Sequence, residues 1–121
     1  MTPAARVARY VRAAMKSLPA EFATRLDNVE IVVQRRASRL QRRRSGGGGD
    51  LYGLYEGVPL AQRGSWYGNV TPDKVTIFWE PLVRDFPDDA DLREQVRRTV
   101  YHEIAHHFGF TDEELLGLAV E

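Results

Sequence analysis

Apolar residues near the N-terminus recur at the i, i+3, i+4 and i+7 spacing of one helix face. They are Val7, Tyr10, Val11, Ala14, Met15 and Leu18. Thr2 and Pro3 are residue types that favour an N-cap and a first helical position. We therefore expect the chain to begin with a helix that ends before Pro19.

Three later segments are rich in β-branched and aromatic residues, which is typical of strands. They are residues 28–34, 51–56 and 74–80. The third segment is followed by Pro81, which cannot donate a hydrogen bond to a neighbouring strand. The pattern thus predicts three short strands.

The first two of these segments are separated by residues 35–50, which are rich in arginine and glycine. Such a composition buries little apolar surface, so we interpret residues 35–50 as a mobile loop. Its four consecutive glycines, residues 46–49, are not followed by Lys and Ser or Thr and do not open a helical pattern. This argues against a phosphate-binding loop.

The longest helical pattern extends from residue 90 to about residue 108. Aspartates at positions 88, 89 and 91 lie at its predicted N-terminus, where the helix dipole favours negative charge. Gly109 is expected to end this helix. Thr111 can then cap a final short helix, predicted over residues 112 to about 119.

This order of elements predicts an α+β fold in which a small antiparallel or mixed sheet packs against the long helix. The length of 121 residues fits one domain over residues 1–121, which can bury a core without disulfides or a structural metal. No stretch approaches the roughly 20 apolar residues that cross a bilayer, and the N-terminus lacks the features of a secretory signal. We therefore expect a cytoplasmic protein.

Positive and negative charges are segregated along the chain, although the net charge is zero. Residues 1–49 hold 11 Lys and Arg against 3 Asp and Glu, whereas residues 50–121 hold 6 against 14. We expect these opposite charges to face each other or solvent in one fold. Contact of the arginine-rich segment with nucleic acid or a membrane surface is the alternative. It is less favoured, because the basic residues fall in two separate segments. No aromatic residue interleaves the arginines, so a platform for base stacking is not expected.

The chain contains no cysteine, so any metal site must use His, Asp or Glu. All three histidines lie within residues 102–107, which read His-Glu-Ile-Ala-His-His. His102 and His106 share one helix face and can both reach a tetrahedral Zn²⁺ at about 2.0–2.1 Å. Glu103 is rotated by about 100° from His102, which places it beside the metal, where a general base for zinc-activated water must stand. His107 projects about 100° away from His106 and is expected beside the site or at the surface.

A catalytic zinc site needs a third protein ligand and one open position. Gly109 allows the chain to leave the helix and turn back. Asp112 follows six residues after His106, at the spacing that a third ligand takes in such motifs. We predict Asp112 as this ligand, with the adjacent Glu113 and Glu114 as alternatives.

Residues 54–60, 73–78 and 92–114 resemble the zincin metallopeptidases, and the chain is similar to the short bacterial minimal zincins. The last stretch is the most specific, because it contains the pattern H-E-x-x-H-x-x-G-x-x-D. The resemblance implies a minimal zincin-like fold, with a small sheet packed on the metal-bearing helix. It also implies zinc as the expected ion.

These features predict a zinc-dependent metallopeptidase-like enzyme that hydrolyses peptide bonds in a peptide or protein substrate. Glu103 is its expected general base, and an extended peptide is expected to lie on an exposed strand, for which residues 74–79 are the best candidate. Tyr52, Tyr67 and Tyr101 are candidate donors of a hydrogen bond to the oxyanion if they fold near the metal, but a structural role is favoured for each. The alternative is a catalytically weak or inactive metal-binding module with a regulatory role, favoured by the shortness of the chain beyond the motif.

Overall fold

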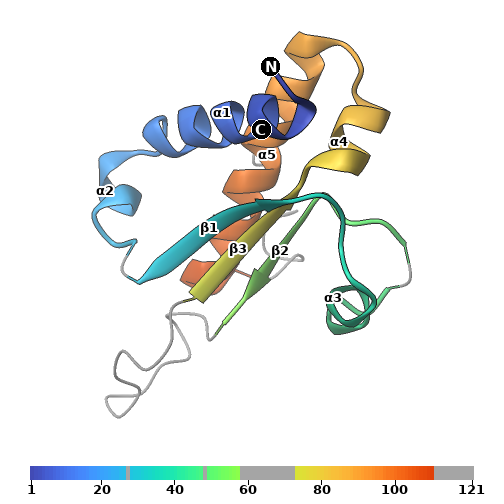
Figure 1. Ribbon diagram of the computed structural model, residues 1–121. Helices are drawn as coiled ribbons and strands as arrows, with labels where there is room; N and C mark the ends of the chain where they lie inside the picture. The colour runs from blue at the N-terminus through green and yellow to red at the C-terminus, as the bar shows by residue number, and fades with distance from the viewer. Residues whose placement is uncertain (27, 48, 58–72, 111–121) are drawn as a thin grey trace.

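The computed structural model describes residues 1–26, 28–47, 49–57 and 73–110. Helix α1 (Pro3–Lys16) begins the chain as the sequence predicts (Figure 1). The side chain of Thr2 accepts a hydrogen bond of 3.0 Å from the backbone N–H of Ala5 and is the N-cap. A short helix that was not predicted, α2 (Ala20–Ala23), follows Pro19.

Three strands form one mixed sheet in the order β1-β3-β2. They are β1 (Val29–Gln34), β2 (Gly53–Glu56) and β3 (Asp73–Phe78). The central strand β3 pairs in parallel with β1 and antiparallel with β2. The predicted α+β class and a small mixed sheet are thus confirmed.

The third strand ends two residues earlier than predicted, because helix α4 (Trp79–Asp85) begins at Trp79. Pro81 is the third residue of α4, in the first turn, where backbone N–H groups have no partner within the helix. Glu80 lies in the same turn and is favoured by the helix dipole. Pro81 therefore lies in the first turn of a helix, whereas the sequence pattern predicted only that it ends a strand.

The loop expected over residues 35–50 is interrupted by helix α3 (Arg39–Arg44), so this part of the prediction is wrong. Ser38 and Gln41 form a capping box, in which each side chain accepts a hydrogen bond from the backbone N–H of the other (3.1 and 2.9 Å). The arginines in the last turn lie at the negative end of the helix dipole. Figure 1 shows α3 on the opposite side of the molecule from α1 and α2.

Helix α5 (Asp89–Phe108) is the longest predicted element and lies behind the sheet in Figure 1. Asp88 caps its first turn by accepting hydrogen bonds from the backbone of Ala90 and Asp91. Gly109 ends it with a left-handed φ of 102°. Its buried apolar side chains pack against α1, β2 and β3, and they are Leu92, Val96, Val100 and Ile104.

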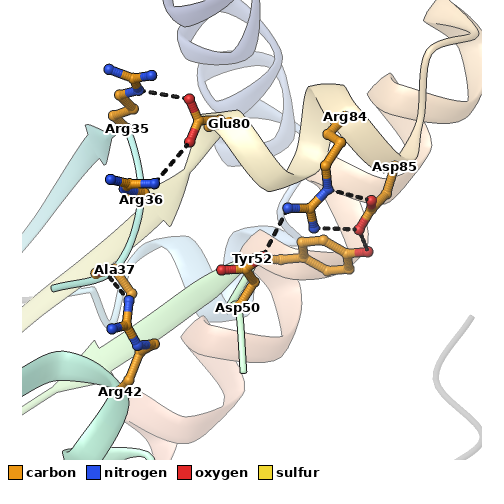
Figure 2. Close-up of polar contacts among 9 residues, drawn as sticks. All are labelled: Arg35, Arg36, Ala37, Arg42, Asp50, Tyr52, Glu80, Arg84 and Asp85. Carbon is orange, nitrogen blue, oxygen red and sulfur yellow. Dashed lines mark hydrogen bonds and ion pairs between the residues drawn. The ribbon is translucent and has the colours of Figure 1, made fainter. Parts of the chain in front are cut away.

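Ion pairs join the basic N-terminal half of the chain to its acidic C-terminal half. They include Arg6–Asp89 (3.8 Å), Arg35–Glu80 (2.7 Å) and Arg44–Glu56 (2.6 Å). Figure 2 shows Arg35 and Arg36 both turned towards Glu80. Some of the segregated charges therefore face one another within the fold, which is one of the two arrangements expected. In the described ranges, no helix is both long and apolar enough to cross a membrane.

Candidate metal centre

His102 and His106 lie on consecutive turns at the C-terminal end of α5, and their imidazole rings converge. Their Nε2 atoms are 3.2 Å apart, and the ring planes meet at 84°. Two nitrogens bound to one tetrahedral Zn²⁺ at 2.0–2.1 Å are separated by about 3.3 Å. The two imidazoles therefore already have the spacing of a ligand pair, and these donors fit zinc.

The end of helix α5 orients His106. Gly109 turns the chain back so that the carbonyl oxygen of Phe110 lies 2.9 Å from Nδ1 of His106. A carbonyl oxygen only accepts hydrogen bonds, so Nδ1 must carry the proton. In the neutral ring this leaves the lone pair on Nε2, the atom that faces His102, as a metal ligand requires.

Glu103 is directed to the sheet side of the same helix turn and is only 8% exposed. It packs against strand β2 at Gly53, where a Cβ atom would come within 3.2 Å of Cγ of Glu103 and 2.7 Å of Cγ2 of Thr99. Only glycine permits so close an approach of the strand backbone to the helix. The Glu103 side chain thus lies on the side of α5 that packs against strand β2.

A pocket of about 300 Å³ opens beside these residues. It is lined by Tyr52, Gly53, Gln95, Arg98, Thr99, His102 and Glu103. Its walls come from the start of β2 and from the face of α5 that lies on the N-terminal side of His102. One candidate ligand and the candidate base therefore border a volume in which part of a substrate can bind.

The predicted third ligand, Asp112, lies outside the described residues, as do Glu113 and Glu114. Within the described part of the chain, no group of three or more His, Asp or Glu side chains is arranged around a common metal position. The structure therefore brings together His102 and His106, and the third ligand remains a prediction from sequence.

His107 is fully buried, so the expectation that it could lie at the surface is wrong. Its Nδ1 is 2.7 Å from Oδ2 of Asp73, which also accepts a hydrogen bond of 2.7 Å from the hydroxyl of Tyr55. A Cβ atom at Gly57 would collide with Asp73, so glycine is needed beside this cluster. The cluster holds the end of α5 that carries the two candidate ligands against the sheet.

The candidate oxyanion donors Tyr52 and Tyr101 have other partners. Tyr52 lines the pocket, but its hydroxyl donates a hydrogen bond of 2.6 Å to Asp85, and this bond raises the pKa of Tyr52 (Figure 2). The hydroxyl of Tyr101 is 2.7 Å from that of Ser17. The third candidate, Tyr67, lies outside the described residues.

An α+β fold with two convergent histidines and a glutamate on one helix defines a class of metal-binding hydrolase-like proteins. The zincin-like metallopeptidase family matches residues 26–119, and the chain belongs to this family. This span includes the whole sheet and helix α5. The resemblance to zincins noted in the sequence is thereby confirmed. No match was found among curated proteins.

Proposed function

We propose that this protein is a zinc-dependent peptidase in which His102, His106 and Asp112 hold Zn²⁺ and Glu103 acts as general base. The observation that carries the proposal is the 3.2 Å separation of the Nε2 atoms of His102 and His106. Glu103 directly follows His102 on the same helix. Membership of the zincin-like metallopeptidase family supports it.

Zinc, when bound, lowers the pKa of a water ligand to about 7 and polarises the substrate carbonyl. The carboxylate of Glu103 accepts a proton from the attacking water and delivers it to the leaving amine nitrogen. The hydrogen bond between His106 and the carbonyl of Phe110 keeps the ligating nitrogen aimed at the metal position throughout.

The strand expected to bind the substrate is not available, because residues 73–78 form the central strand β3, which is paired on both sides. Strand β2 is an edge strand of the described sheet, and Gly53 within it lines the pocket beside Glu103. We propose that an extended peptide adds to the edge of β2, with its scissile bond at the metal centre.

A catalytically weak metal-binding module is the second candidate function. It is favoured by the engagement of two candidate oxyanion donors, since Tyr52 is bonded to Asp85 and Tyr101 to Ser17. The loss of one oxyanion donor typically costs about 10²–10³ in kcat. The two functions share the metal site and differ only in turnover.

Metal analysis and digestion of a proteome-derived peptide library distinguish these functions. Wild type should bind one zinc per chain, and His102→Ala should lose it. Glu103→Gln should retain zinc and lose cleavage, because it removes the base and no metal ligand. Equal zinc content in wild type and His102→Ala would refute the metal centre. A zinc-loaded wild type that cuts nothing beyond what Glu103→Gln cuts would leave the binding module as the function.

A further inference from the structure

The pocket beside the metal centre extends along one face of α5 towards its N-terminus. Gln95, Arg98 and Thr99 line it together with His102 and Glu103, at the i, i+3, i+4, i+7 and i+8 spacing of one helix face. Arg98 is one helical turn from His102, a rise of about 6 Å along the helix axis. A cationic side chain therefore shares the pocket with a candidate ligand and the candidate base.

The charge of Arg98 is only partly compensated. Glu94 forms ion pairs with both Arg97 (2.5 Å) and Arg98 (3.0 Å), so one carboxylate faces two guanidinium groups. Hydrogen bonds from Arg97 and Arg98 lower the pKa of Glu94 to about 2. This cluster therefore keeps one excess positive charge at neutral pH. Arg98 uses its Nε atom for Glu94, and its two Nη groups make no hydrogen bond to the described residues.

A neutral donor, the side-chain amide of Gln95, accompanies Arg98 in the pocket. The hydroxyl of Thr99 donates to the backbone carbonyl of Gln95 (2.8 Å), and the side-chain amide of Gln95 donates to Thr99 (3.3 Å). These bonds orient the amide of Gln95 along the pocket wall. The acidic lining residue is Glu103, at the metal end. The end formed by Gln95 and Arg98 thus presents hydrogen-bond donors and positive charge, which together match a carboxylate.

We infer that Arg98 binds a substrate carboxylate, so that the preferred substrates are peptides with an Asp or Glu side chain, or a free C-terminal carboxylate, close to the bond that is cut. The inference rests on the proposed peptidase function. A rise of about 6 Å corresponds to one or two residues of an extended peptide, at about 3.3 Å per residue. Arg98 is then the residue that determines specificity on this side of the scissile bond.

Binding is measured with zinc-loaded Glu103→Gln protein, which does not consume the peptide. The probes are four dansylated alanine-rich hexapeptides that carry either Glu or Gln at one internal position and end in either a free carboxylate or an amide. Arg98→Gln is compared with Arg97→Gln in this background. Arg97 is the matched control, because it pairs with the same Glu94 but does not line the pocket.

Arg98→Gln should weaken binding of the carboxylate-bearing peptides about tenfold and leave the neutral, amidated peptide within about twofold. Arg97→Gln should weaken the carboxylate-bearing peptides much less, because Arg98 keeps its two Nη groups for the ligand although Glu94 then compensates its charge. The two singly charged peptides show whether the side chain or the C-terminus supplies the carboxylate, and a preference for either supports the inference. Equal affinity for all four peptides, or equal losses in the two arginine variants, would overturn it.

The same peptides, incubated with zinc-loaded wild type, separate this inference from the proposed function. Cleavage that is unaffected by the carboxylates and by Arg98→Gln would overturn the specificity site and leave the peptidase function standing. A carboxylate preference in binding, without any cleavage, would support the site and remove the peptidase function.

Discussion

Gly53 determines how closely strand β2 approaches helix α5. A Cβ atom at this position would lie 2.7 Å from Cγ2 of Thr99 and 3.2 Å from Cγ of Glu103. The first distance is shorter than van der Waals contact permits, and both neighbours line the pocket. A side chain here would push the candidate base out of position as well as strain the packing.

We therefore expect Gly53→Ala to lower the free energy of unfolding by about 1–3 kcal/mol and to reduce any peptidase activity. Gly49→Ala is the control, since nothing lies within 4 Å of the added methyl group, and it should stay within about 0.5 kcal/mol of wild type. Urea unfolding measures both variants. A Gly53→Ala protein as stable as Gly49→Ala would contradict the close packing of β2 on α5.

The contacts of His107 could not be predicted from its place beside the H-E-x-x-H motif. Helix geometry correctly turns its ring away from His106 and the candidate metal position, but it does not say which residues the ring contacts there. The structure places it in the core against Asp73, which is 34 positions earlier in the chain. A buried histidine next to a buried carboxylate is a structural anchor, and its neighbour His106 is a candidate ligand.

At the scale of elements, a polar network connects the segment before β2 with the C-terminal end of α4 (Figure 2). Arg84 bridges Asp50 (2.8 Å) and Asp85 (2.8 Å), and Tyr52 donates to Asp85. The hydrogen bonds from Arg84 and Tyr52 lower the pKa of Asp85 from 3.8 to about 2. The network holds in place Tyr52, which forms one wall of the pocket.

The pKa shift of Asp85 predicts how stability depends on pH. Because its pKa is lower in the folded protein, the ionised carboxylate stabilises the fold above pH 4, and this contribution is lost as the pH falls through about 2. The stability difference between wild type and Asp85→Asn should therefore be constant above pH 4 and shrink between pH 4 and pH 2. Urea unfolding across this range measures it.

Glu21→Gln is a suitable control for this titration, since Glu21 makes no hydrogen bond or ion pair with the residues that the structure describes. If Asp85→Asn and Glu21→Gln show the same pH dependence, the network is not the source of the effect.

At the scale of the whole molecule, we expect zinc binding and folding to be linked through helix α5. The helix packs against α1, β2 and β3, and both candidate histidine ligands lie at its C-terminal end. A ligand that binds only the folded state stabilises it by mass action. Zinc should therefore raise the free energy of unfolding of the whole domain, although the hydrophobic core is expected to form without it.

Zinc at a free concentration of 100 times its Kd should stabilise wild type by about 2.7 kcal/mol, which raises Tm by roughly 10 °C. His102→Ala should fold without zinc, because His102 is exposed, and should lose this shift. Thermal unfolding with and without added zinc measures the effect. The same shift in wild type and His102→Ala would indicate zinc binding at another place.

The sequence by itself determined the features that depend on residues within one or two helical turns. Helix α1 with its cap Thr2, helix α5 with its stop at Gly109, and the pairing of His102 with His106 all follow from helix periodicity and capping. The capping box of α3 also depends on residues only three positions apart. It was not predicted, because the arginine and glycine content of residues 35–50 indicated a loop. Asp112 remains a prediction from spacing.

Only the tertiary structure decided which strand is central, which face of α5 borders a pocket, and what His107 and Tyr52 contact. Strand order depends on how β1, β2 and β3 pair, and each has a strand-like composition that fits an edge or a centre equally well. The contacts of Tyr52 with Asp85 and of His107 with Asp73 span 33 and 34 positions. No local pattern encodes such contacts, because they arise when the burial of the whole core brings distant segments together.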